Sequence, residues 1–172
     1  MIERPISVLV YAFNEEDKAD QLLKALKDLD RRGIFDILNA AVLVTQEDGQ
    51  FRLRETEDVD ARRGALFGAV VGGLVGLLGG PAGVIVGAAA GAATGGVAAH
   101  RIDMGFSEEY LREIQTSLEP GSSALIALVE HEWVDRVIEE LEQYEGRLFR
   151  QAIQADIAAQ LAASQSSQEA QE

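Results

Sequence analysis

Two short segments of the chain are almost continuously apolar, and a helical pattern follows each of them. Residues 6–13 are ISVLVYAF, and residues 123–129 are SALIALV. Short runs rich in β-forming residues predict strands that are buried on both faces of a sheet. The helical patterns that follow share one apolar spacing and so predict similar amphipathic helices in two similar halves: Ala19, Leu22, Leu23 and Leu26 in the first half, and Val134, Val137, Ile138 and Leu141 in the second.

Capping and turn residues set the expected ends of the elements in the first half. Asn14 has the side chain of a helix N-cap, and Gly33 can end the helix that it opens. We expect a second strand at residues 40–45. The Asp48-Gly49 turn then leads into residues 51–54, whose alternating apolar and polar side chains predict a β-hairpin.

The second half has similar signals. Ser107 is the expected N-cap of a helix that ends near Pro120-Gly121, and Phe106 and Leu111 have the spacing of a hydrophobic staple. We expect residues 147–153 to form the last strand. Two βαβ units around one sheet predict an α+β domain, a ferredoxin-like α/β sandwich. Another α/β sheet stays open as an alternative, because strand–helix alternation is common to such domains.

A glycine-rich stretch, residues 64–100, separates the two halves and has no charged residue. Glycine recurs at about every fourth position, and Gly79-Gly80-Pro81 interrupts the pattern. Residues four apart lie close to one helical face, so the stretch predicts a glycine-zipper hairpin of two helices, residues 64–80 and 82–99. We expect the glycine ridges to be oligomerisation sites: Gly64, Gly68, Gly72, Gly76, Gly83, Gly87, Gly91 and Gly95.

Such a hairpin is not expected to be stable alone in water. Each glycine inside a helix costs roughly 0.8–1.0 kcal/mol relative to alanine, so each arm loses about 4 kcal/mol. The first arm carries large apolar residues and could face lipid, whereas the middle of the second arm, GAAAGAATGG, is small on every side. We therefore expect the second arm at the centre of a self-assembly and the first arm outside it.

The stretch is borderline for crossing a membrane. Each arm would be about 25–27 Å long, against about 30 Å for the hydrocarbon core. Arg62-Arg63 and Arg101 flank the hairpin, so the positive-inside rule keeps both ends cytoplasmic. The sequence favours a domain on the cytoplasmic side of the cell membrane, anchored by an oligomeric, membrane-inserted bundle. The alternative is a cytosolic homo-oligomer whose hairpins bury one another.

Composition narrows the classes of partner. The net charge of −14 argues against binding nucleic acid through phosphate contacts. The chain has no cysteine, which excludes disulfides and thiolate metal sites. Its start lacks the pattern of a secretory signal peptide, so we expect a cytoplasmic protein unless the glycine-rich stretch redirects it.

Few residues suggest chemistry. His131 lies between two glutamates without converging partners, so we expect an exposed histidine rather than a metal ligand. His100 could sense pH at an interface, but a plain boundary residue is favoured. Trp133 is expected to pack on the sheet. An acidic run could bind a cation but matches no EF-hand-like loop, which favours a solvated linker: Glu55, Glu57, Asp58 and Asp60.

Motifs for phosphate binding and nucleophilic catalysis are missing from the sequence. There is no GxGxxG after a strand, no Walker-type GxxxxGK[ST], and no evident Ser-His-Asp or Cys-His set. We therefore expect a protein that is not an enzyme and that needs no cofactor or metal. A small-ligand-sensing regulatory module is a further alternative, on fold analogy alone.

Three segments, in this order, resemble a known family: SVLVYAFNEEDKADQLLKAL, ETEDVDARRGALFGAVVGGLVGLLGGPAGVIVGAAAGAATGG and DMGFSEEYLREIQTSLEPGSSALIALVEHEWVDRVIEEL. Together they resemble a bacterial family of unknown function, described as predicted membrane proteins, in which a glycine-zipper hairpin interrupts a small α/β domain. The resemblance implies a membrane-associated or stress-linked protein and supplies no catalytic residues.

The expected organisation has four parts. Residues 1–60 and 102–152 are the two halves of the α/β domain, and residues 61–101 are the inserted helical hairpin. Residues 153–172 are expected to be a short helix, lined by Ile153, Ile157 and Leu161, followed from Ser164 by a disordered tail in which nothing can be buried.

Overall fold

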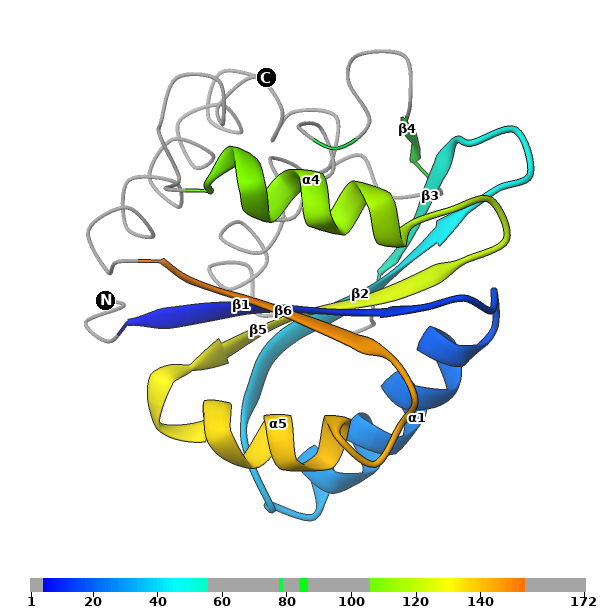
Figure 1. Cartoon of the computed structure of the whole chain (residues 1–172). Helices are drawn as coiled ribbons and strands as arrows, with labels where there is room; N and C mark the ends of the chain where they lie inside the picture. Colours follow the sequence, from blue (N-terminus) through cyan, green and yellow to red (C-terminus); the bar gives the residue numbers. More distant parts are fainter. Residues whose placement is uncertain (1–4, 56–77, 79–83, 87–105, 154–172) are drawn as a thin grey trace, which may run out of the picture.

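The computed structural model describes residues 5–55, 78, 84–86 and 106–153 (Figure 1). These residues form one sheet with helices on both faces, which confirms the prediction of an α+β domain. In chain order the elements are β1 (Ile6–Phe13), α1 (Lys18–Arg31), β2 (Ile37–Thr45), β3 (Phe51–Glu55), β4 (Val84–Val86), α4 (Glu108–Ser117), β5 (Ser123–Glu130), the 3-10 turn η1 (His131–Trp133), α5 (Val134–Leu141) and β6 (Arg147–Ile153).

The strand order in the sheet is β4-β3-β2-β5-β1-β6. Neighbouring strands are antiparallel, except that β3 and β4 are parallel. Strands β1 and β5, which are the two apolar runs of the sequence, pair with each other inside the sheet. Each half of the chain thus supplies one of these two strands and one strand beside the other half's apolar strand, so neither half folds into a sheet of its own.

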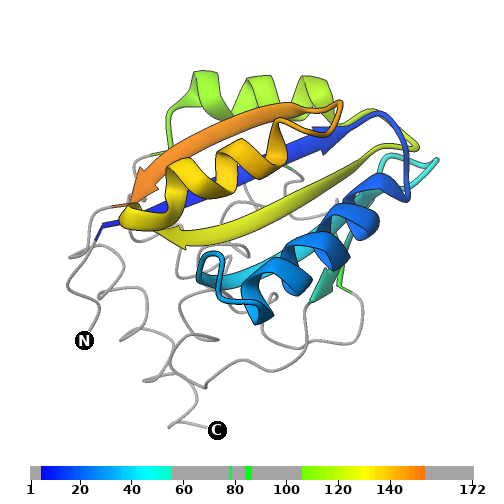
Figure 2. The same cartoon turned by 90° about the horizontal axis from the view of Figure 1, so that it is seen from below.

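Helices α1 and α5 cover one face of the sheet, and α4 lies across the opposite face (Figures 1 and 2). Side chains alternate between the two faces along β1 and β5. On β1, for example, Val8 and Val10 belong to the cluster beneath α4, whereas Leu9 and Tyr11 belong to the cluster beneath α1 and α5. Because both faces are covered, these strands are apolar at almost every position.

Helix α1 begins later than the sequence predicts. Asn14 is not its N-cap; the cap position is Asp17, whose side chain makes no capping hydrogen bond. The side chain of Ser123 in β5 caps the helix instead. Its Oγ accepts a hydrogen bond from the Ala19 amide at 3.2 Å and donates one to the Glu15 carbonyl at 2.6 Å. A side chain from the other half of the chain therefore satisfies a backbone donor that helices leave unpaired at their start.

Strand β2 begins at Ile37, three residues before the predicted start at residue 40. Gly33, Gly49 and Ser107 have their predicted roles. Gly33 ends α1 with φ of 72°, and its amide bonds the Asp30 carbonyl while the next amide bonds the Leu29 carbonyl. This is the Schellman arrangement, which needs a left-handed residue and so favours glycine. Gly49 turns the β2–β3 hairpin with φ of 82°. Ser107 caps α4, its Oγ accepting from the Tyr110 amide at 3.1 Å.

The predicted second helix of the hairpin, residues 82–99, is wrong at Val84–Val86. These three residues form strand β4 and pair in parallel with β3. The physical reason is tertiary pairing: the edge of β3 offers backbone partners, and the β-branched side chains favour the extended backbone that pairs with it. Apart from Leu78, the remaining residues of the hairpin lie outside the described residues, as do residues 154–172 of the predicted tail.

Candidate functional site: where the glycine-rich stretch meets the sheet

The residues predicted to drive association are not among those that the structure describes. The eight glycines named above lie outside the described residues, as do His100, Glu57, Asp58 and Asp60. What the structure does describe of the stretch is Leu78 and Val84–Val86, and each contacts the α/β domain. The candidate site is therefore built from these contacts.

Leu78 lies in the core beneath α4. Its side chain is 7% exposed, and it belongs to the same buried cluster as Tyr110 and Ile114 of α4. The Gln115 side-chain amide donates to the Leu78 carbonyl at 2.9 Å. This bond satisfies a backbone acceptor that burial would otherwise leave unpaired, so α4 holds Leu78 by packing and by a hydrogen bond together.

Strand β4 provides the second attachment. Val84 pairs with Phe51, Ile85 with Arg52 and Val86 with Leu53, which extends the sheet by one short strand beyond β3. Figure 1 shows β4 beside β3, on the side of the sheet away from β2. Because Leu78 and β4 flank Pro81, both attachments involve the middle of the glycine-rich stretch.

Helix α4 is itself fixed to the sheet at its two ends. Near its start, Tyr110 stacks on Phe106 with ring centroids 5.7 Å apart and meets Phe149 of β6 edge-on at 6.4 Å. Near its end, Arg147 of β6 reaches Glu113 at 3.7 Å and Ser117 at 3.4 Å. Both ends of the helix are therefore held against β6.

The hydroxyl of Tyr110 is a weak point in this interface. The residue is 9% exposed, and within the part of the chain that the structure describes this oxygen has no hydrogen-bond partner. Burial raises the pKa of the Tyr110 phenol well above its usual range, so the group stays neutral at physiological pH. A buried hydroxyl left unpaired costs about 1–3 kcal/mol, so the packing of α4 on the sheet is not optimal.

The other candidate residues show structural roles or none. His131 is exposed in η1, and among the described residues no group of three metal-ligating side chains comes together. Trp133 is half-buried and packs against the cluster beneath α1 and α5, as predicted, and the Arg136 guanidinium lies 5.8 Å from its ring centroid. Glu55 contributes its backbone to β3, paired with Ala41.

None of the helices in the described ranges combines the length and the hydropathy needed to span a bilayer.

Sequence reasoning missed the five residues that organise this site, which are Val84–Val86, Leu78 and Gln115. Val84-Ile85-Val86 is three consecutive β-branched residues between glycines, and this is a strand signal that the glycine period obscured. Leu78 looks like any leucine of the first arm. Gln115 lies among polar residues of α4, and no local signal shows that its amide bonds a carbonyl 37 positions away.

Comparison with known families gives one match. A family model described as "Protein of unknown function (DUF1269)" matches residues 65–165. The matched range contains the glycine-rich stretch from its second residue onward, followed by α4, β5, α5 and β6. No curated protein and no solved structure matches the chain.

Proposed function

The chain belongs to this family, and we propose that it is a non-enzymatic protein that associates with further copies of itself through the glycine-rich stretch. In this proposal the α/β domain binds and positions the stretch. The family match supports a shared role of the stretch and the domain, because it covers more than half of the chain and includes the stretch together with α4, which contacts Leu78.

We also propose that the domain is ferredoxin-like, and strand order supports this. Without β3 and β4, the strands follow the order β2-β5-β1-β6, and both intervening helices, α1 and α5, lie on one face. This is the order expected when two βαβ units interlock around one sheet. Strand β3 extends the sheet beyond β2, and α4 is an addition on the opposite face.

The attachment of the middle of the stretch to the domain carries the proposal. A hairpin that projected away from the domain would carry Leu78 and Val84–Val86 near its far end. Their contacts with α4 and β3 instead favour a stretch that is enclosed by protein. These contacts involve four residues, and an uncharged, glycine-rich segment of this length needs further enclosure. Small residues at a fixed spacing pack closely against matching surfaces, so a second copy suits that role.

Insertion of the stretch into a membrane is the second candidate. It is favoured by the large apolar residues of the first arm, which each contribute about −0.3 to −0.6 kcal/mol to insertion: Leu66, Phe67, Val70, Val71, Leu74, Val75, Leu77 and Leu78. Full insertion would require the domain to release Leu78 and β4. The two candidates share self-association and differ in what surrounds the assembly.

Light scattering and vesicle flotation together test both candidates. The full chain, purified without detergent, is expected to form a discrete oligomer, and Gly87→Leu or Gly91→Leu should reduce it to a smaller species. Lys27→Leu, which adds a leucine on the exposed face of α1, is the matched control and should change nothing. A monomer that also fails to float with lipid vesicles would refute both forms of the proposal, and an oligomer that floats would favour the membrane form.

A further inference from the structure

A hollow of about 660 Å³ opens at the C-terminal end of α4. Three segments far apart in the sequence line it: residues 12–14 at the end of β1, residues 116–119 at the end of α4, and residues 145–147 at the start of β6. Its volume is in the range of pockets that take small molecules, about 300–1,000 Å³. The functions proposed above leave this hollow unused.

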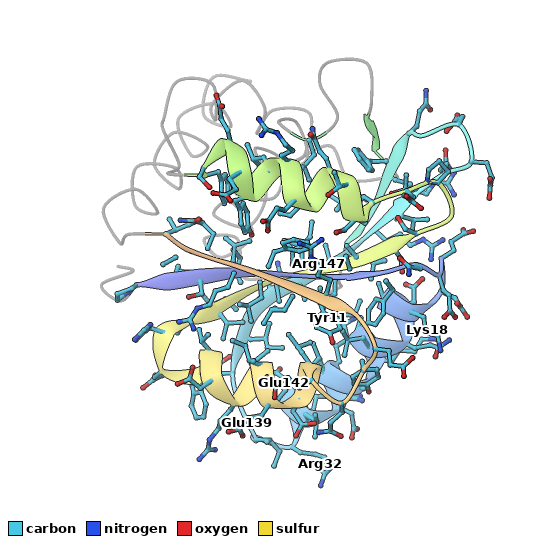
Figure 3. All side chains as sticks on the ribbon, viewed as in Figure 1. Tyr11, Lys18, Arg32, Glu139, Glu142 and Arg147 are labelled. Atoms are coloured by element: carbon cyan, nitrogen blue, oxygen red, sulfur yellow. The ribbon has the colours of Figure 1, made fainter. Side chains whose placement is uncertain are left out.

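The floor of the hollow is held firmly in place. Ala12 and Arg147 are directly opposite in the β1–β6 ladder. The Tyr11 hydroxyl, on the other face of the sheet, donates to the Tyr144 carbonyl at 2.5 Å and so ties the turn before β6 to β1 (Figure 3). A side chain at Gly146 would collide with the Tyr11 ring and lie 2.8 Å from the Ala12 carbonyl oxygen, so only glycine fits there.

Arg147 is the cation among the lining residues, and its guanidinium is positioned from three sides. It lies 5.0 Å from the Phe149 ring centroid, 3.7 Å from the Glu113 carboxylate and 3.4 Å from the Ser117 hydroxyl (Figure 3). The side chain is still 58% exposed. A guanidinium has five N–H donors in a planar fork, and these long contacts leave most of them free for a carboxylate.

The opposite charge lines the rest of the hollow. Glu119 and Glu145 are exposed lining residues. The C-terminal end of α4 also borders the hollow. Backbone carbonyls there carry partial negative charge, and no basic residue lies in the last turn. A cationic group would therefore be stabilised on this side, whereas a purely anionic ligand would be repelled by it.

We propose that this hollow binds a small zwitterion, a free amino acid, with its carboxylate on Arg147 and its ammonium group between Glu119 and Glu145. One cation and two carboxylates around a hollow of this size match both ends of such a ligand. A simple anion would use Arg147 alone, and a simple amine would use the glutamates alone. The site does not depend on self-association of the chain.

A thermal-shift screen of the full chain with the free amino acids, followed by calorimetric titration, tests the proposal. At least one amino acid should raise the melting temperature. Its matched amine, which lacks the carboxylate, and its matched acid, which lacks the ammonium group, should each bind about tenfold more weakly, because each loses one charge-assisted contact. Arg147→Gln and the double variant Glu119→Gln/Glu145→Gln should weaken binding by about the same factor.

Two charge-matched controls distinguish the site from general electrostatics. Arg52→Gln and Glu139→Gln remove exposed charges of the same kinds elsewhere and should leave binding unchanged. Gly91→Leu should also leave it unchanged, so a failure of the self-association proposal would not affect this result. The proposal is overturned if no amino acid binds, if an analogue with a single charge binds equally well, or if Arg147→Gln binds as the original chain does.

Discussion

The two faces of the sheet are built differently. On one face, α1 and α5 each bury three residues against strands of both halves of the chain. On the other, α4 buries two residues within its length and holds Leu78 from the glycine-rich stretch, and its Tyr110 hydroxyl has no hydrogen-bond partner among the described residues. The α1/α5 face is a closed core, whereas the α4 face holds Leu78 of the glycine-rich stretch and the residues 116–119 that line the hollow. Substitutions on the α1/α5 face should therefore lower the free energy of unfolding more than substitutions on the α4 face.

The largest effect is expected on the closed face. Leu26 of α1 is 1% exposed, so Leu26→Ala removes a full side chain from the core and should lower the free energy of unfolding by about 3 kcal/mol. Urea denaturation measures this loss. The oligomer mass at low denaturant should not change, and a Leu26→Ala protein that remains as stable as the original would contradict the closed-core description.

The next effect tests how the two halves of the chain are joined. Ser123→Ala removes the hydroxyl that bonds the Ala19 amide and the Glu15 carbonyl, so it should cost about 1–2 kcal/mol. Thr116→Ala is the control, because that hydroxyl is exposed and bonds only within its own helix. Equal effects of the two substitutions in urea denaturation would show that Ser123 is not a cap for α1.

A smaller effect is expected on the α4 face. Gln115→Ala removes the bond to the Leu78 carbonyl and should cost about 1 kcal/mol. Hydrogen exchange is the sharper measurement: amides of Val84–Val86 and of β3 should exchange faster, while those of β5 keep their protection. Gln143→Ala, which removes a surface bond to Glu140, should alter neither group. If exchange in β4 is unchanged after Gln115→Ala, the pairing of β4 with β3 does not depend on the bond between Gln115 and Leu78, which would contradict this prediction.

The smallest effect on stability is expected at Tyr110. Tyr110→Phe removes a hydroxyl that has no partner within residues 5–55, 78, 84–86 and 106–153, so stability at neutral pH should stay equal or rise by up to about 1 kcal/mol. A loss of more than that amount in urea denaturation would mean that the hydroxyl is paired in solution.

The pH dependence of Tyr110 has a defined sign. Burial raises its pKa, so the folded protein keeps the phenol proton after the unfolded chain releases it. The stability that this provides is complete below about pH 10, the unfolded value, and is lost as pH rises further. Tyr110→Phe should therefore lose less stability above pH 10 than the original chain. A residual slope is expected from Tyr11, whose pKa is also raised by burial. Identical alkaline denaturation curves would contradict this assignment.

Most of the α/β domain was predictable because its signals are local. The apolar runs of β1 and β5, the helical spacing of α1 and α5, the glycine turns and the Ser107 cap each depend on neighbouring residues. The late start of α1 was not predictable, because the helix is capped by the Ser123 side chain, which lies 104 positions from the Ala19 amide that donates to it. The sequence also gave no sign that Gln115 bonds Leu78.

In the glycine-rich stretch, by contrast, the local pattern predicted the wrong element. A regular period of glycines predicts helices when only the neighbouring sequence is taken into account. At Val84–Val86 the nearby edge of β3 offers backbone partners, and β-branched side chains accept the extended form, so tertiary pairing overrides the period. The hollow beside Arg147 was equally hidden, since its lining comes from three distant segments.

Oxidative cross-linking tests most directly whether the glycine-rich stretch, and not the α1/α5 face, joins the copies. The chain has no cysteine, so a single introduced thiol reports on one position alone. Ala90→Cys places it in the stretch, and Lys27→Cys places it on the exposed face of α1. The account predicts covalent dimers for Ala90→Cys far in excess of those for Lys27→Cys, in protein purified without detergent. Equal cross-linking at both positions, or more at Lys27→Cys, would contradict it.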